Sequence, residues 1–220
     1  MTAPIYAPTT SPRAFAQGTV HVVDDDELMC KGLTALLESI DLHVRSFRSV
    51  EDYLRAPKLE GPSCLVLDVR LRGQSGLAFQ KSAMQTGQPH MPMVFMSGHA
   101  DIAMSVKAMK AGAVDFLAKP FRDQDMIDAV MVALERDMRR LETEQSLSGL
   151  RSSWETLTTR EREVLRHVAA GSMNKTIAAA MGIAEITVKI YRGHAMRKMN
   201  ARTVVEAVQI MRALGEVSAA

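Results

Sequence analysis

The chain shows a regular alternation of short apolar runs with longer segments of mixed polarity. Apolar and β-branched residues gather in five runs of strand length, namely Thr19–Val23, His43–Phe47, Cys64–Asp68, Pro92–Met96 and Val114–Ala118. Between the runs, apolar residues recur at helical spacing, as at Leu33, Leu37 and Ile40. Strands that alternate with helices favour a parallel sheet covered on both faces. The pattern therefore predicts a doubly wound α/β domain with a five-stranded parallel sheet over residues 19–137.

The pattern changes after the last of these runs. A helix is predicted to begin near Asp123 and to continue into the charged stretch ERDMRRLETEQ. Because charge replaces apolar periodicity there, residues 138–153 are expected to form a solvated helical linker, ending near Ser148 and Gly149. Residues 1–18 are rich in Pro, Thr and Ala and predict a disordered N-terminal tail.

Residues 154–220 carry no strand signal and predict a second, all-α domain of four helices. Thr158 followed by Glu161 fits a capping box at the start of the first helix, and Gly171 and Gly182 end the first two. The predicted helices are Thr159–Ala170, Asn174–Met181, Glu185–Met199 and Ala201–Leu214.

Charge separates the two domains. Residues 151–220 hold 11 Lys and Arg against 6 Asp and Glu, whereas residues 1–150 hold 16 against 19. The C-terminal part, at +5, favours an anionic partner. The apolar runs are far shorter than the ~20 residues that cross a bilayer, and the N-terminus has no signal-peptide pattern. Cys30 and Cys64 lie in apolar stretches, typical of buried thiols, so we expect a cytoplasmic protein without a membrane partner.

Acidic, hydroxyl and basic residues follow the predicted strands of the first domain. Asp24 and Asp25 end the first strand, Asp68 the third, Ser97 the fourth and Lys119 the fifth. The carboxyl ends of parallel strands form the ligand-binding edge of such a sheet. Clustered carboxylates favour a small hard cation such as Mg²⁺. An aspartate can act as a nucleophile toward a phosphoryl group, which a metal, a lysine and a hydroxyl would stabilise.

Together these motifs (VHVVDDDE, CLVLDV, VFMSGH and AVDFLAKPF) resemble the flavodoxin-like receiver domain of response regulators over about residues 19–140. The resemblance implies that Asp68 is the phosphoacceptor, that Ser97 and Lys119 contact the phosphoryl oxygens, and that Phe116 is the aromatic switch residue. It also implies an Mg²⁺ site formed by Asp24, Asp25, Asp68 and the backbone carbonyl of Arg70. Asp25 would bind the metal directly and Asp24 through water. The stretches SGHADIAMSVKAM and AMKAGAVDFLAKPF are similar to the FixJ-like branch.

The segment NKTIAAAMGIAEITVKIYRGHAMRKM has helix-turn-helix organisation, with a short helix, a turn at Gly182 and a longer basic helix. In the longer helix, Val188, Tyr191, Ala195 and Met199 fall on one face and are expected to pack inward. The basic residues Lys189, Arg192, Arg197 and Lys198 then remain on the surface, where they can neutralise phosphates.

This segment, together with the preceding LTTREREVLRHVAAG, resembles the LuxR-type DNA-binding domain of NarL/FixJ response regulators over about residues 157–212. By that resemblance Lys189 and Ile190 face bases, Arg192 lies beside them, and Asn174 and Lys175 lie near the phosphate backbone. The implied DNA-binding set is Asn174, Lys175, Thr187, Lys189, Ile190, Arg192 and Arg197. The last helix, with Val204, Val205, Val208 and Met211, is a candidate dimerisation face.

The resemblance implies a transcription factor, not an enzyme, although self-phosphorylation from small donors and autodephosphorylation belong to its chemistry. The implied partners are a sensor histidine kinase, promoter DNA, RNA polymerase and a second copy of the chain after phosphorylation. One alternative is an aspartyl-phosphate enzyme, which needs a second Asp two residues after the nucleophile, where this chain has Arg70. Another is a phosphorylation-independent DNA-binding regulator whose receiver domain is only a dimerisation scaffold.

Overall fold

A computed structural model describes residues 18–71, 75–85, 91–98 and 102–217. The chain divides into two compact units, one ending at Leu141 and the other beginning at Glu142. The predicted tail, apart from Gly18, lies outside the described residues. No helix in the described part is long and apolar enough to cross a membrane.

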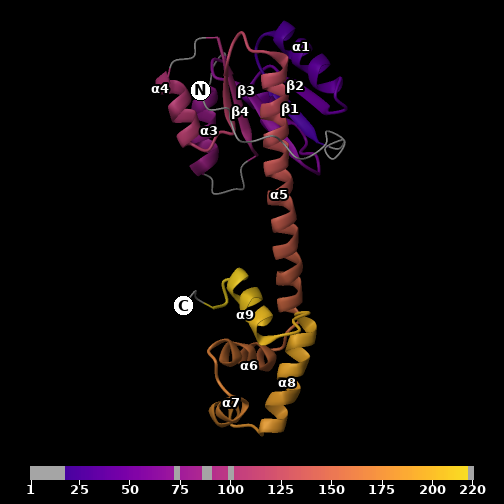
Figure 1. Ribbon diagram of the computed structural model, residues 1–220, viewed down its shortest axis with the longest axis vertical. Coiled ribbons are helices and arrows are strands. Elements are labelled where there is room, and N and C mark those ends of the chain that lie inside the picture. The colour runs from indigo at the N-terminus through magenta and orange to yellow at the C-terminus, as the bar shows by residue number, and fades with distance from the viewer. Residues whose placement is uncertain (1–17, 72–74, 86–90, 99–101, 218–220) are drawn as a thin grey trace, which may run out of the picture. The chain divides into compact units, whose positions relative to one another are not determined.

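The N-terminal unit is built on a five-stranded parallel sheet (Figure 1). Its strands are β1 (Thr19–Val23), β2 (His43–Phe47), β3 (Ser63–Asp68), β4 (Met93–Ser97) and β5 (Asp115–Ala118). The spatial order is β2-β1-β3-β4-β5, so the chain winds in both directions from β1. This confirms the doubly wound fold, with three strands beginning or ending one residue away from the predicted positions.

Two apolar cores, one on each face of the sheet, hold the unit together. The strands β1, β3 and β4 are buried along their whole length, as strands covered on both faces must be. The helices are α1 (Glu27–Glu38), α2 (Val50–Arg55), α3 (Gly76–Gln85), α4 (Ile102–Lys110) and α5 (Asp123–Glu155). Leu37 of α1 and Leu134 of α5 belong to one core, whereas Val50, Phe79 and Ala108 of α2, α3 and α4 belong to the other.

Helix α5 is longer than the sequence pattern predicts. It is a single helix of 33 residues that ends at Glu155, so the predicted end near Ser148 and Gly149 is wrong. Leu147, Leu150 and Trp154 follow one another at spacings of three and four, and Trp154 is buried. This short apolar stripe continues the helix past Gly149, whose own effect is only about 1 kcal/mol relative to Ala.

The C-terminal unit contains α6 (Thr159–Ala169), α7 (Asn174–Met181), α8 (Glu185–Lys198) and α9 (Val204–Ala213). The predicted capping box at the start of α6 is present, and Gly182 ends α7 in the left-handed conformation at φ 65°. Helix α9 begins three residues later than predicted because Thr203 caps it, its side chain accepting a hydrogen bond from the backbone N–H of Glu206.

Candidate functional site

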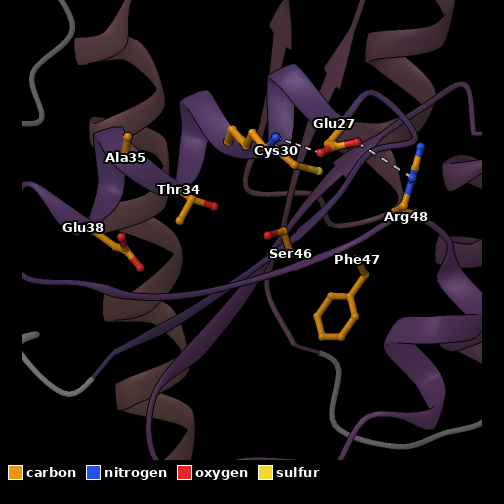
Figure 2. A pocket seen from close by; sticks show the side chains of 9 residues that line it. Glu27, Cys30, Thr34, Ala35, Glu38, Ser46, Phe47 and Arg48 are labelled. Atoms are coloured by element: carbon orange, nitrogen blue, oxygen red, sulfur yellow. Dashed lines mark ion pairs between the residues drawn. The ribbon is translucent and has the colours of Figure 1, made fainter.

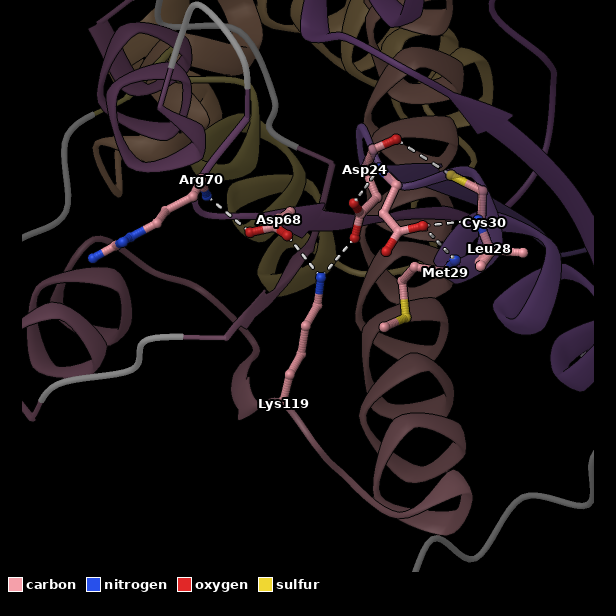
Figure 3. Close-up of polar contacts among 8 residues, drawn as sticks. Asp24, Leu28, Met29, Cys30, Asp68, Arg70 and Lys119 are labelled. Carbon is pink, nitrogen blue, oxygen red and sulfur yellow. Dashed lines mark hydrogen bonds and ion pairs between the residues drawn. The ribbon is translucent and has the colours of Figure 1, made fainter.

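Three charged side chains meet at the carboxyl edge of the parallel sheet (Figure 3). Asp24 follows β1, Asp68 ends the neighbouring strand β3, and Lys119 follows β5. The Nζ of Lys119 lies 2.7 Å from Oδ2 of Asp24 and 2.7 Å from Oδ2 of Asp68. The structure therefore brings together residues that are 51 and 95 positions apart in the sequence.

Backbone N–H groups fix the other oxygen of each carboxylate. The N–H of Asp26 donates to Oδ1 of Asp24 at 2.9 Å, and the N–H of Arg70 donates to Oδ1 of Asp68 at 2.8 Å. The Cys30 thiol donates to the backbone carbonyl of Asp24 at 3.4 Å. Both carboxylates are thus held in one orientation by the turns that follow their strands, before any ligand binds.

Burial and charge oppose each other in this cluster. Asp24 is only 1% exposed, and burial raises its pKa, with the negative charge of Asp68 adding to the effect and Lys119 opposing it. Burial alone would lower the pKa of Lys119, but its hydrogen bonds to Asp24 and Asp68 outweigh this and raise it. Lys119 therefore remains an ammonium group at neutral pH, positioned to attract an anion.

The remaining predicted receiver residues lie around this cluster. Ser97 is fully buried at the end of β4, and its carbonyl accepts the N–H of Lys119 at 2.9 Å. Phe116, in β5, is partly buried, with its ring 6.4 Å from that of Phe95. Asp25 is partly exposed beside Asp24. Their roles in phosphoryl and metal binding stay predictions.

The donor chemistry of this edge fits Mg²⁺. That ion prefers oxygen ligands, takes one or two carboxylates and keeps several waters. In the described part of the chain, no three His, Cys, Asp or Glu side chains are arranged as metal ligands. The predicted ligands, namely the carboxylates of Asp24, Asp25 and Asp68 and the carbonyl of Arg70, together with water, are all oxygen donors. Each hydrogen-bonded carboxylate oxygen retains a lone pair for coordination.

The backbone at the start of α3 lies close to the backbone of Asp68. Gly76 begins α3, and a Cβ at this position would lie 2.5 Å from the backbone oxygen of Asp68 and 3.0 Å from Cγ of Leu67. Because the first contact is with backbone, a side chain here cannot be accommodated by a change of rotamer. The glycine allows α3 to pack directly against the strand that carries Asp68.

We expect Gly76→Ala to lower the free energy of unfolding of the N-terminal unit by about 1–3 kcal/mol, as overpacking does in other cores. Urea unfolding followed by circular dichroism measures the change. Gly32→Ala is the matched control, because Gly32 lies in α1 with open space around its Cα. Ala is the better helix former by about 1 kcal/mol, so the control should stabilise the unit. Equal effects of the two substitutions would contradict the steric explanation.

A pocket of about 380 Å³ lies nearby between α1 and β2 (Figure 2). Glu27 at its rim pairs with Lys31 at 2.7 Å and with Arg48 at 4.0 Å. Cys30 lines the pocket and is buried, and burial raises the pKa of its thiol. Since the thiolate is the reactive form, Cys30 is a poor nucleophile at neutral pH.

Helix α8 of the C-terminal unit presents the predicted DNA-binding residues. Lys189, Ile190 and Arg197 are exposed, and Thr187 is partly buried. Val188, Ala195 and Met199 are buried and Tyr191 is partly buried, which confirms the inward-facing stripe.

The start of α7 contacts α8 through a polar pair. The guanidinium of Arg192 donates to Oδ1 of Asn174 at 3.1 Å, so two residues of the DNA-binding set are already linked, and Lys175 is exposed next to them. Ile186, which is not among the predicted DNA-binding residues, is 63% exposed one helical turn before Ile190. The sequence shows these two apolar residues four positions apart, which was the signal for an exposed apolar pair on this helix.

One surface expectation in the C-terminal unit is wrong. Met211 belongs to the core and is 1% exposed, so it is no part of a dimerisation face, whereas Val205 of the same helix is exposed. Helical spacing alone does not tell which side of a helix its neighbours cover. Lys198 is exposed, as predicted, and its Nζ lies 2.7 Å from Oε2 of the buried Glu161.

Comparisons with known proteins match each unit to a known family. The response regulator receiver domain family matches residues 20–131, and the bacterial regulatory proteins of the luxR family match residues 155–211. Nodulation protein W of Bradyrhizobium diazoefficiens is 48% identical over 202 residues, covering 92% of this chain and 88% of that protein. The transcriptional regulatory protein FixJ of Azorhizobium caulinodans is 40% identical over 191 residues, covering 87% and 90%.

Two solved structures are also similar to this chain over most of its length. The response regulator StyR has a TM-score of 0.79 at 39% identity, covering 89% of this chain and 98% of that one. Full-length FixJ from B. japonicum has a TM-score of 0.54 at 34% identity, covering 92% and 99%.

Proposed function

Since the chain belongs to the two-component response regulators that join a receiver domain to a LuxR-type DNA-binding domain, we propose that Asp68 is phosphorylated with Mg²⁺ bound and thereby controls dimerisation and promoter binding. The family makes the protein a transcription factor with a sensor kinase and DNA as partners, and not an enzyme. The observation that carries the proposal is the Lys119 ammonium held 2.7 Å from the Asp68 carboxylate.

The proposed transfer uses Asp68 as a nucleophile. Its carboxylate oxygen attacks the phosphorus of a phosphohistidine, the P–N bond breaks as the new P–O bond forms, and the released imidazole takes a proton. The product on Asp68 is an acyl phosphate. Mg²⁺, when bound, neutralises charge on the phosphoryl oxygens. Lys119 shifts from its contact with the carboxylate to a phosphoryl oxygen, and the hydroxyl of Ser97 donates to another.

Phosphorylation then acts on the DNA-binding unit through dimerisation of the receiver domain. Movement of Ser97 toward the phosphoryl group and inward rotation of Phe116 favour a second copy of the receiver domain. Two C-terminal units on one DNA bind with a higher effective concentration, so affinity rises without new base contacts. Lys189, Ile190 and Arg192 would face bases, with Asn174, Lys175, Thr187 and Arg197 around them. RNA polymerase is the expected partner at the promoter.

Incubation with Mg²⁺ and acetyl phosphate tests the receiver chemistry. We expect one phosphoryl adduct on the wild type by intact mass, labile to hydroxylamine as an acyl phosphate is, and none on Asp68→Asn. Asp41→Asn is the matched control, because Asp41 is exposed in the turn after α1, and it should be phosphorylated like the wild type. An adduct that survives in Asp68→Asn would refute the assignment.

The same samples test the consequence for DNA binding. Duplexes selected from random sequence by the phosphorylated wild type provide the probe. We expect acetyl phosphate to raise the affinity and the dimer fraction of the wild type and to leave Asp68→Asn unchanged. Equal DNA affinity in all samples would support the alternative in which the receiver domain is only a scaffold.

A further inference from the structure

One face of α8 is exposed and carries a distinct order of side chains. Ile186, Ile190, Gly193 and Arg197 follow one another at spacings of four, three and four, so they lie in one row along the helix. All four are exposed, with Ile186 at 63% and Ile190 at 48%. The buried stripe of α8 lies on the other side of the helix. This row therefore holds two bulky apolar side chains that the core of the unit does not use.

The surroundings of the two isoleucines are charged. Lys189 lies between them in the sequence, and its Nζ is 3.5 Å from Oε1 of Glu185. Both of these residues are exposed, as is Arg197 at the far end of the row. An apolar pair within a basic surface fits an anionic partner that offers small apolar groups at particular positions. The DNA major groove has this chemistry, because phosphates border it and the C5 methyl group of thymine is the apolar group on its base edges.

Gly193 occupies a position where nothing in this unit requires a glycine. Its backbone is helical, and it is not among the described glycines with a positive φ. Apart from its chain neighbours and the backbone of its own helix, no described atom lies within 4 Å of a Cβ built on Gly193. Glycine is less favourable than alanine inside a helix, but it lets another molecule approach the backbone closely. At this exposed position, that molecule would come from outside the unit.

Arg197 places a cation beside the open space at Gly193. Its Nε donates to the carbonyl oxygen of Gly193 at 3.4 Å, so the guanidinium folds back along the row. A guanidinium has the donor geometry that matches a phosphate. The row thus changes from apolar groups in the first turns of α8 to a cation in the last turn. Residues near the start of a helix in the major groove reach base edges, and later ones can reach the backbone.

We propose that Ile186 and Ile190 contact the methyl groups of two thymines in the major groove, and that Gly193 lets α8 lie close enough to the duplex for this contact. The inference rests on the proposed DNA-binding function and adds a base preference to it. Residues four apart in a helix have Cβ atoms about 5–6 Å apart, and nucleotides follow one another at about 3.4 Å along the duplex. The two thymines therefore lie within about two base-pair steps of each other. Ile186 becomes a specificity-determining residue outside the DNA-binding set that the sequence implies.

Replacing thymine by uracil in the duplex tests the contact, because it removes only the methyl group from the base edge. Fluorescence anisotropy measures the affinity of the phosphorylated wild type for duplexes that it selected from random sequence. We expect two thymines in each half-site, within two steps of each other, at which uracil weakens binding about fourfold, as for one buried methyl group. Ile186→Ala should weaken binding to the thymine duplex by a similar factor and abolish the uracil effect at one of the two positions. The salt dependence of its affinity should not change, because no phosphate contact is lost.

Leu54→Ala is the matched control for Ile186→Ala. Leu54 lies in α2 of the other unit and is also 63% exposed, so this variant should retain both uracil effects. Two uracil effects that persist in Ile186→Ala would overturn the role of Ile186. Wild-type affinity for a fully uracil-substituted duplex would overturn the contact with methyl groups. Both results leave the proposed function intact, whereas a wild type that selects no duplex would refute DNA binding and this inference with it.

Gly193→Ala tests the close approach, because stability and DNA affinity should change in opposite directions. Alanine is the better helix former, so the urea midpoint from the fluorescence of Trp154, which is buried in this unit, should rise. Affinity for the selected duplex should fall about tenfold, within the range for overpacking a close contact. Gly32→Ala adds the same methyl group to α1, where the space is also open, and should leave DNA affinity unchanged. Unchanged or higher DNA affinity in Gly193→Ala would overturn the close approach.

Discussion

Asp137→Ala is expected to lower the free energy of unfolding of the N-terminal unit by about 3 kcal/mol, the range for removing one partner of a buried ion pair. Asp137 lies in α5 and is fully buried. Its Oδ2 accepts the backbone N–H of Ser63 at 2.9 Å, and its Oδ1 lies 2.8 Å from Nε of Arg140. Truncation leaves a buried N–H without this acceptor and removes the ion pair between Asp137 and the half-buried guanidinium.

The chain's single tryptophan separates this effect from changes in the other unit. Trp154 is buried in the core of the C-terminal unit, beside Leu157 and Leu165. Its fluorescence therefore follows the unfolding of that unit alone, whereas circular dichroism follows both units. In urea, Asp137→Ala should shift the dichroism transition and leave the fluorescence transition in place.

A conservative variant distinguishes the two partners of Asp137. Asp137→Asn keeps an acceptor for the N–H of Ser63 but removes the charge opposite Arg140, so we expect a smaller loss of stability, about half that of Asp137→Ala. Equal losses would show that the stabilisation comes from the ion pair within α5 and not from the hydrogen bond that joins α5 to Ser63. If Asp137→Ala is as stable as the wild type, Asp137 does not stabilise the N-terminal unit.

Asp137 also shows where sequence reasoning stops. The order of strands and the residues that end them follow from local patterns, because a buried strand and the polar residue after it are adjacent in the chain. The pattern ERDMRR suggested only a solvated helix, yet Asp137 is fully buried. Its partner Ser63 is 74 positions away, and the pairing becomes visible only when α5 is placed against β3.

The residues of the candidate phosphorylation site were easier to predict from the sequence than the surface of the C-terminal unit. Asp24, Asp68 and Lys119 follow strands, and parallel topology brings strand ends to one edge. On α8 the sequence correctly indicated the buried stripe of Val188 and Ala195. It did not reveal the ion pair of Lys198 with Glu161, because a contact with a residue of α6 depends on how two helices cross, which periodicity does not encode.

Glu161→Ala is expected to destabilise the C-terminal unit by about 3 kcal/mol, through loss of a helix cap and of a buried charge pair. Glu161 is 3% exposed. Its Oε2 accepts the N–H of Thr158 at 2.8 Å and lies 2.7 Å from Nζ of Lys198, in the last turn of α8. Lys198 also donates to the carbonyl of Thr156 at 3.1 Å. One carboxylate thus caps α6 and anchors the end of the helix that presents the DNA-binding residues.

A double-mutant cycle isolates the charge pair from the cap. Glu161→Gln retains an oxygen for the N–H of Thr158, and Lys198→Met retains the aliphatic stem of the lysine. Removing either charge alone leaves the other without its opposite charge, so we expect the double variant to lose less stability than the sum of the two single losses. The coupling between them should be about 1–3 kcal/mol by tryptophan fluorescence. Additive effects would show that the pair contributes little.

The same carboxylate makes the stability of the C-terminal unit depend on acid. Burial alone would raise the pKa of Glu161, but hydrogen bonds from Lys198 and Thr158 and the charge of Lys198 outweigh it and hold the pKa below its ordinary value of 4.5. In the unfolded chain Glu161 therefore takes up its proton at a higher pH than in the folded unit. Its contribution is fully present above pH 4.5 and is lost as the pH falls toward the folded-state pKa. Urea midpoints from Trp154 fluorescence should decline over that range in the wild type and decline less in Glu161→Gln, which cannot titrate. An unchanged slope in Glu161→Gln would assign the acid sensitivity of this unit to another group.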